Sequence, residues 1–347
     1  MKTIHEGMTV IYAESFRQLL QENKLTTLFQ PPSLLFVSTV DIYDQLYDSV
    51  TRHCDSSDQF QWFICPNEFK VNTLETIQKL YQFIDDMKLP TGTRLIGFGD
   101  DELANMCGYL AESHIVIKDY YFLAINFSGF VTAVSCQPSL INRSLTTTTR
   151  FLTNDKLKGL IYDASLARHL AKGNAESLSL LVLFKYALTT NKMLLKRLYQ
   201  ESLTKPLSLT VYCDDILRTL TNQTADFLCF GDFFTTGLYQ TEGAHYLTFT
   251  QKKWLGCLLQ FFWCQRQFNV KIEGNQLIEW LQWLIKESLV LPNNILSSDL
   301  SNEIYQECRR YQQIQAITAL GVSNQVTIPS QESLYETIEE YRQLIKI

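Results

Sequence analysis

Residues 73–110 read TLETIQKLYQFIDDMKLPTGTRLIGFGDDELANMCGYL, and this stretch decides the class of fold. Apolar side chains in its first part recur at the spacing of one helix face over residues 73–87: Leu74, Ile77, Leu80, Tyr81 and Ile84. Asn72, with Glu75 three residues later, predicts the N-terminal cap of that helix. Residues 90–92 end it, residues 93–98 read as a strand, and Gly99 leads to a second helix at about residues 102–111.

The flanking residues extend this alternation in both directions. SLLFVS (33–38) and FQWFI (60–64) are predicted strands, so strands and helices alternate through the first 150 residues and indicate a mostly parallel sheet. The polar segment NRSLTTTTRFLTN (142–154) is predicted to cross between two domains. Beyond it the helical period dominates, over residues 175–200, 213–222, 251–268 and 274–288. We therefore expect an α/β domain over residues 1–150 and an α-helical domain over residues 151–347.

Composition narrows the possible partners and the compartment. The chain has 347 residues, 46% of them hydrophobic and 19% charged, which suits two globular domains. Its net charge of −6 supplies no positive field, so neither nucleic acid nor an anionic membrane is an expected partner. The nine cysteines include no C-x-x-C pair, and no apolar run reaches about 18 residues. These features predict a soluble, cytoplasmic protein with reduced cysteines.

The order of features in residues 65–109 resembles 3-dehydroquinate synthase, of the sugar-phosphate cyclase superfamily. The matching features are a turn led by Pro66, a helix start at 74–76 (LET), a strand ending in Gly97-Phe98-Gly99, and the pair Gly108-Tyr109. Later pieces keep the family's order and spacing: LKGLIYDASLARHL (157–170), LLVLFKYALTTNKMLLKRL (180–198), LCFGDFFTTG (228–237) and ITALGVSNQVTIPSQESLYETIEEY (317–341). The chain is thereby similar to this family over nearly its whole length, although its site residues are altered.

The resemblance implies a Rossmann-like N-terminal domain joined to a C-terminal α-helical domain, with the active site in the cleft. It also implies a homodimer formed through the N-terminal domain. Members of the family bind NAD and a divalent metal, usually zinc. They cyclise a seven-carbon sugar phosphate by transient oxidation, phosphate elimination, reduction and aldol closure.

The resemblance places the NAD site around Gly97, Gly99 and Lys70. Gly99 falls on the first glycine of the family's phosphate-binding run, whereas Asp100 and Asp101 replace the other two. A carboxylate about 5 Å from a phosphate is repelled by about 3 kcal/mol at an effective dielectric near 20. NAD is therefore not expected to bind usefully. Two readings of residues 100–102 stay open: an acidic helix start that favours the helix dipole, and an acidic metal-binding turn.

The resemblance also places a metal site, on Asp232 and His245. Val182 stands where the family has a glutamate, three residues before Lys185, and Asp232 replaces the first of two histidines. Asp232 and His245 leave two protein ligands where a catalytic zinc usually has three. Lys185 is the retained residue of catalytic type, and Lys205 is a less direct match to another substrate lysine.

Two functions stay open on this basis. The altered positions are those of the family's cofactor-binding, metal-binding and catalytic residues, whereas the apolar pattern that builds the fold persists. We therefore expect a non-catalytic homologue that binds a small anion or a protein partner and uses no cofactor. The alternative is an active, divergent synthase that uses Lys185, NAD and a metal on Asp232 and His245.

Overall fold

A computed structural model describes residues 2–5, 7–12, 14–30, 33–54, 59–66, 71–135, 139–141, 148–150, 156–166, 174–220 and 226–345. The strands are β1 (Lys2–His5), β2 (Met8–Tyr12), β3 (Ser33–Thr39), β4 (Gln59–Cys65), β5 (Thr93–Gly99), β6 (Ile117–Ala124), β7 (Ser139–Ile141), β8 (Thr148–Arg150), β9 (Leu157–Tyr162), β10 (Gln313–Ala319) and β11 (Val322–Thr327).

The helices fill the intervals between the strands and most of the second half. The α-helices are α1 (Phe16–Gln21), α2 (Thr26–Phe29), α3 (Val40–Thr51), α4 (Leu74–Asp86), α5 (Asp101–Ser113), α6 (Phe127–Val134), α8 (Asn174–Thr190), α9 (Lys192–Ser202), α10 (Cys213–Leu220), α11 (Asp232–Gln240), α12 (Phe249–Phe268), α13 (Gly274–Ile285), α14 (Ser297–Cys308) and α15 (Gln331–Ile345). Three short 3-10 helices are η1 (Leu209–Tyr212), η2 (Asp226–Cys229) and η3 (Glu242–Tyr246).

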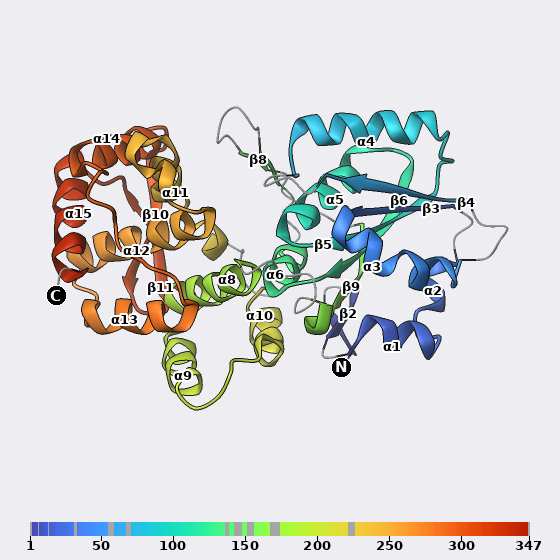
Figure 1. Ribbon diagram of the computed structural model, residues 1–347, viewed down its shortest axis with the longest axis horizontal. Coiled ribbons are helices and arrows are strands. Elements are labelled where there is room, and N and C mark those ends of the chain that lie inside the picture. Colours follow the sequence, from blue (N-terminus) through green and yellow to red (C-terminus); the bar gives the residue numbers. More distant parts are fainter. Residues whose placement is uncertain are drawn as a thin grey trace. The chain divides into compact units, whose positions relative to one another are not determined.

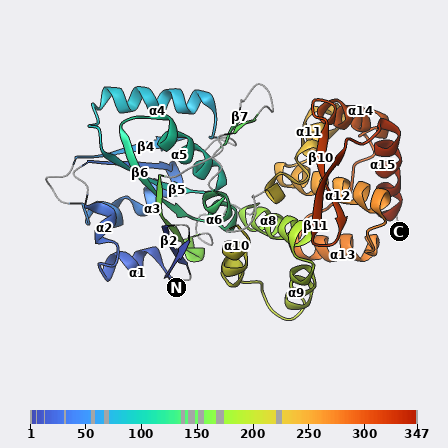
Figure 2. The same ribbon diagram turned by 180° about the vertical axis from the view of Figure 1, so that it is seen from behind.

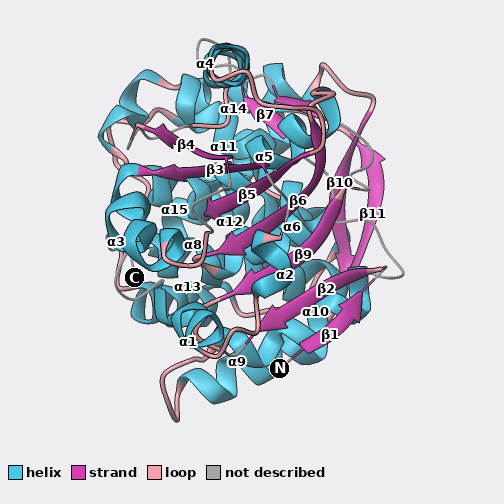
Figure 3. Ribbon diagram, turned by 90° about the vertical axis from the view of Figure 1, so that its right-hand side faces the viewer, coloured by secondary structure: helices cyan, strands magenta, loops and turns pink. Residues whose placement is uncertain are grey.

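Seven strands form one sheet in the order β1-β2-β9-β6-β5-β3-β4. Only the β1–β2 pair is antiparallel, and the other neighbours run parallel. Figure 3 shows the strands in this order, from β4 at the top to β1 at the bottom. β3 is buried along nearly its whole length, as expected for a parallel strand whose two faces are both covered by helices.

Neighbouring residues of β4 reveal which helices cover which face. Trp62 packs on Tyr43 and Tyr47 of α3, whereas Phe63 packs on Phe83 of α4. Successive side chains of a strand point to opposite faces, so α3 and α4 lie on opposite sides of the sheet (Figure 1). α5 shares the side of α4, because Gly97 of β5 faces Cys107 while the next residue, Phe98, stacks on Trp62.

The predicted cap of α4 was wrong by one residue. Thr73, not Asn72, precedes the first turn in an extended conformation, and its hydroxyl accepts a hydrogen bond from the amide of Thr76. Asn72 is buried instead. Either residue type can cap a helix, so the position was decided by how the incoming chain packs.

The chain divides into two compact units, and their boundaries differ from the expected division near residue 150. The first unit comprises Met1–Ser179 and Ser208–Ala225, and the second comprises Leu180–Leu207 and Asp226–Ile347. β9 lies beyond residue 150 but pairs with both β2 and β6, which keeps it in the first unit. α10 also belongs there, and Tyr12 of β2 donates a hydrogen bond to Asp214 of α10.

Part of the predicted crossover, residues 142–154, can be compared with the structure. Thr148–Arg150 forms β8, which pairs antiparallel with β7, and the rest of the segment lies outside the described residues. The helix predicted over 175–200 is two helices. Asn191 interrupts it and caps α9 by accepting hydrogen bonds from the amides of Met193 and Leu194.

α12 is the centre of the second unit. It is apolar nearly all round, which is the pattern of a buried helix, and Trp254 and Trp263 are both within the core. α11 and α15 pack on it, and the β10–β11 hairpin runs alongside it (Figure 2). No helix in the described part of the chain is long and apolar enough to cross a bilayer.

Candidate functional site

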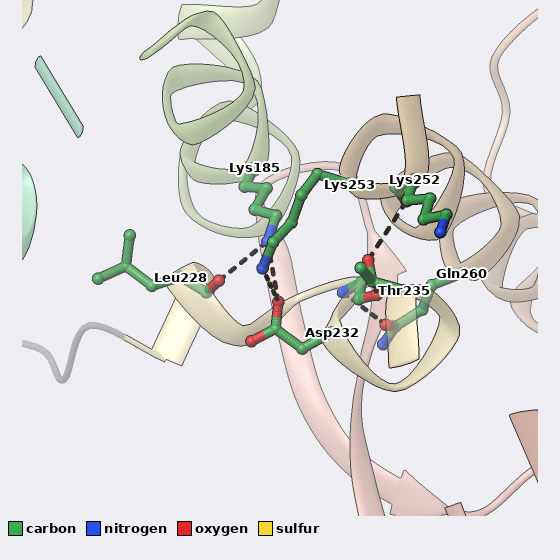
Figure 4. Close-up of polar contacts among 8 residues, drawn as sticks. Lys185, Leu228, Asp232, Thr235, Lys252, Lys253 and Gln260 are labelled. Carbon is green, nitrogen blue, oxygen red and sulfur yellow. Dashed lines mark hydrogen bonds and ion pairs between the residues drawn. The ribbon is translucent and has the colours of Figure 1, made fainter. Parts of the chain in front are cut away.

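Three charged side chains from three helices of the second unit, two lysines and one aspartate, meet at one place (Figure 4). The Nζ of Lys185, on α8, lies 3.4 Å from Oδ1 of Asp232, the first residue of α11. The Nζ of Lys253, on α12, lies 3.8 Å from the same oxygen. Lys185 also donates to the carbonyl of Leu228 at 2.9 Å. Two ammonium groups thus converge on a single carboxylate.

Gly231 places Asp232 at this point. Its φ of 90° lies in the left-handed region, and a Cβ there would lie 2.7 Å from the Cα of Cys257 on α12. The amide of Gly231 donates to Gln260 of α12 at 2.6 Å, and Gln260 in turn donates to the carbonyl of Gln315. α11 therefore begins against the backbone of α12, and its first side chain emerges beside Lys185.

Two adjacent lysines of α12 have different surroundings. Lys253 reaches Asp232, whereas the Nζ of Lys252 lies 4.5 Å from the ring centre of Tyr239. Lys252 is buried, and that burial lowers the pKa of its ammonium. Cys257, one turn further along, stays a thiol, because burial raises its pKa to about 12.

Among the described residues, the predicted metal ligands Asp232 and His245 belong to no group of three metal-binding side chains. Val182 is buried as an apolar core residue of α8, and His245 is exposed on η3. The carboxylate of Asp232 already faces two ammonium groups. Over the described ranges no three His, Cys, Asp or Glu side chains are grouped so as to hold a metal ion. A zinc or cobalt site with three protein ligands does not fit these residues.

Gly97 and Gly99 lie near the carboxyl end of β5, and close packing accounts for both. A Cβ on Gly97 would lie 2.6 Å from Sγ of Cys107, and one on Gly99 would lie 2.3 Å from Cδ1 of Leu103. Both contacts are with α5, so these glycines bring the helix onto the strand. Lys70, the third predicted NAD residue, lies outside the described residues, and Lys205 is exposed in the turn after α9.

Asp100 caps α5. Its Oδ1 accepts hydrogen bonds from the amides of Glu102 at 3.1 Å and Leu103 at 3.3 Å. The first of the two readings of residues 100–102, an acidic helix start, describes this geometry. Desolvation, with a smaller contribution from the charge of Asp101, raises the pKa of Asp100 to about 6. A pyrophosphate at this helix end would have to displace the capping carboxylate or meet it protonated.

Lys253 is the site residue that sequence reasoning missed. A signal for it exists in the sequence: Lys252 and Lys253 lie within the first two turns of a helix whose middle is almost entirely apolar. Positive charge near a helix N-terminus is unfavourable, so two lysines there indicate a compensating anion or a role beyond solubility. Which anion compensates them depends on the tertiary contacts.

Neither the profiles of known protein families nor the curated proteins include a match to this sequence. Solved structures do match. 2-epi-5-epi-valiolone synthase from Streptomyces hygroscopicus subsp. jinggangensis, with NAD+ and Zn2+ bound, is similar with a TM-score of 0.75 over 98% of each chain, at 12% identity. 2-deoxy-scyllo-inosose synthase complexed with carbaglucose-6-phosphate, NAD+ and Co2+ is similar with a TM-score of 0.73 over 98% of this chain and 99% of that one, at 10% identity.

A third solved structure is similar to this chain with a lower TM-score. A probable glycerol dehydrogenase from Sinorhizobium meliloti matches with a TM-score of 0.61 over 100% of this chain and 99% of that one, at 13% identity. The protein has the dehydroquinate synthase-like fold, with a Rossmann-like α/β part followed by a helical part. The fold prediction and the resemblance to sugar-phosphate cyclases are confirmed.

The expectation that no cofactor is used was wrong. The valiolone synthase structure holds NAD+ and Zn2+, and the inosose synthase structure holds NAD+ and Co2+. Structures of two proteins with this fold therefore favour cofactor use over its absence. The expectation rested in part on Asp100 and Asp101 occupying the phosphate site, whereas the carboxylate of Asp100 caps its own helix.

Replacing Gly231 with alanine tests the contact that positions Asp232. The positive φ and the 2.7 Å approach to Cys257 both oppose a Cβ, so we expect the free energy of unfolding to fall by about 2–4 kcal/mol. Gly7→Ala is the matched control, since Gly7 has a φ of 82° but open space around a Cβ, and about 1 kcal/mol is expected. Thermal unfolding of both variants compares them. Equal losses would contradict the packing role.

Replacing Asp100 with asparagine tests the buried charge. The pKa of Asp100 is raised in the folded state, so the folded protein binds this proton more tightly than the unfolded chain between about pH 4 and 6. Stability from this group therefore falls as the pH rises through that window, by up to about 3 kcal/mol. Asn keeps the capping oxygen and removes the charge.

We expect Asp100→Asn to raise the melting temperature at pH 7.5 by about 2 °C or more and to match the wild type at pH 4. Circular dichroism at both pH values measures this. Asp86→Asn, at the exposed end of α4, is the control and leaves both temperatures unchanged. A gain at pH 7.5 that persists at pH 4 would refute the assignment.

Proposed function

We propose that this protein is a divergent sugar-phosphate cyclase that binds a nicotinamide dinucleotide at its parallel sheet and holds a polyol phosphate near Lys185. The observation that carries the proposal is the likeness to 2-epi-5-epi-valiolone synthase over 98% of both chains, with a TM-score of 0.75. That extent covers the α/β part and the helical part together. Two cyclases among the similar structures hold NAD+, which supports the choice of cofactor.

The carboxyl edge of the sheet is where this proposal places the dinucleotide. β3 ends at Thr39, β5 at Gly99 and β6 at Ala124, and helices α3, α5 and α6 begin within three residues of these ends. Ligands of open α/β sheets bind at this edge, with phosphates at a helix N-terminus. A bound nicotinamide would accept a hydride from a substrate hydroxyl during transient oxidation.

The hydrogen bonds and the burial of Lys185 favour a role for this residue in holding substrate. An ammonium donates three hydrogen bonds, and those of Lys185 to Leu228 and Asp232 account for two. The side chain is buried, so its position is held by α8 and α11 and not by solvent. The third donor suits a hydroxyl or an oxyanion. The described residues supply no three-ligand metal set, so no step is assigned to a metal.

A homologue that binds these ligands without turnover is the second candidate. Val182 in the core of α8, in place of an acidic residue, is the observation that favours it. Release of inorganic phosphate from six- and seven-carbon sugar phosphates, with NAD and with zinc or cobalt added, separates the two. Turnover that needs NAD and is lost in Lys185→Met supports the cyclase. NAD binding without phosphate release supports the second candidate, and absence of both contradicts the proposal.

NAD affinity is expected to depend on pH through Asp100. Because the pKa of Asp100 is raised to about 6, its carboxylate is mostly charged at pH 7.5 and mostly protonated at pH 5. Removing that charge beside a pyrophosphate lowers the repulsion, so the dissociation constant should fall about tenfold or more from pH 7.5 to pH 5.

Calorimetry with NAD at the two pH values measures the effect. Asp100→Asn should bind at pH 7.5 as tightly as the wild type does at pH 5 and should lose most of the pH dependence. Asp86→Asn should behave as the wild type. A pH dependence that survives in Asp100→Asn would assign it to another group.

A further inference from the structure

The resemblance assigns no role to Lys253, yet this residue completes a charged cluster of the second unit. Lys185 and Lys253 contribute two positive charges and Asp232 one negative charge, so the cluster carries a net charge of +1. Both ammonium groups approach the same oxygen, Oδ1 of Asp232. Figure 4 shows the side chains of Lys185 and Lys253 pointing to that oxygen from two different helices, α8 and α12.

The cluster is open to solvent on one side. The side chain of Lys185 is only 6% exposed, whereas those of Lys253 and Asp232 are 32% and 39% exposed. Lys253 and Asp232 are therefore accessible to a ligand from solvent, and the Nζ of Lys185 lies next to the carboxylate of Asp232. The Nζ of Lys253 also lies 5.7 Å from the ring centre of Phe249, one turn earlier in α12, so this ring attracts the ammonium only weakly.

Electrostatics at this point favour an anion. Asp232 is the first residue of α11, a helix of nine residues, and the first amides of a helix have no intrahelical acceptor. Their partial positive charge adds to that of the two lysines. A divalent cation would have to enter against both ammonium groups for one carboxylate, and the described ranges provide no further pair of ligands there.

We propose that Lys185 and Lys253 form an oxyanion site for a phosphate group, and that the carboxylate of Asp232 holds the two ammonium groups in place until the phosphate exchanges with it. A phosphate dianion carries more charge than a carboxylate and offers more acceptor oxygens, so it can bridge both ammonium groups. The inference goes beyond the proposed function in assigning Lys253 and Asp232. It rests on that function only for the sugar that the phosphate would carry.

Lys252 provides a matched control on the same helix. It is the neighbouring residue and the same residue type, but its ammonium lies over the ring of Tyr239 and not at Asp232. Figure 4 shows the Lys252 and Lys253 side chains diverging from α12. A general effect of removing a lysine would appear in both variants, whereas loss of a phosphate ligand would appear only in Lys253→Met.

The experiment is a titration of the full chain with inorganic phosphate, without NAD, by calorimetry at pH 7.5 and low ionic strength. Lys253→Met is expected to weaken binding tenfold or more, and Lys252→Met to change it less than twofold. Asp232→Asn is expected to tighten binding at least threefold, because it removes the competing carboxylate. Lys253→Arg keeps the charge and should retain binding within about fivefold of the wild type. Near-ultraviolet circular dichroism establishes that each variant is folded.

A parallel titration with Zn2+ gives the opposite signs if the cluster is a cation site. In that case Asp232→Asn abolishes zinc binding, Lys253→Met strengthens it, and the inference is wrong. The inference is also overturned if phosphate fails to bind the folded wild type, or if Lys252→Met weakens it as much as Lys253→Met. The titration involves neither NAD nor turnover, so it is independent of the test of the proposed function. NAD-dependent phosphate release can be observed when phosphate does not bind this cluster, and phosphate can bind this cluster when no release is observed.

Discussion

In each unit, a glycine that cannot carry a Cβ comes directly before an aspartate that starts a helix. Gly99 precedes Asp100 at the start of α5, and Gly231 precedes Asp232, the first residue of α11. A Cβ on Gly99 would lie 2.3 Å from Leu103, and one on Gly231 would lie 2.7 Å from the backbone of Cys257. This close packing leaves the aspartate as the first side chain available at each helix start.

The two aspartates then meet different surroundings. Asp100 bonds the amides of its own first turn, which are two and three residues away in the chain. Asp232 meets Lys185 and Lys253, which are 47 and 21 residues away and come from two other helices. The first arrangement is local and mainly caps a helix. The second exists only because α8, α11 and α12 pack together, and it concentrates charge at one place in the helical unit.

The fold persists at 10–13% identity because it depends on apolar pattern and close packing more than on particular polar residues. Val182 illustrates this. At the position where the resemblance expects a metal-binding glutamate, a valine is buried in α8 and packs as part of the core. The helix keeps its place while the chemistry at that position changes. A fold match at this identity therefore shows the fold, and the polar residues must decide the function.

The amino-acid sequence by itself determined the alternation of helix and strand around residues 73–110, the strand β3, the apolar face of α4 and the helix α12. Each of these follows from local periodicity, which a single segment carries. Only the tertiary structure decided that β9 and α10 join the first unit, that Thr73 and not Asn72 caps α4, and that Lys253 reaches Asp232 while Lys252 does not. Periodicity says which face of a helix is buried, but not which other helix that face meets. The partner of a charged side chain depends on that second choice.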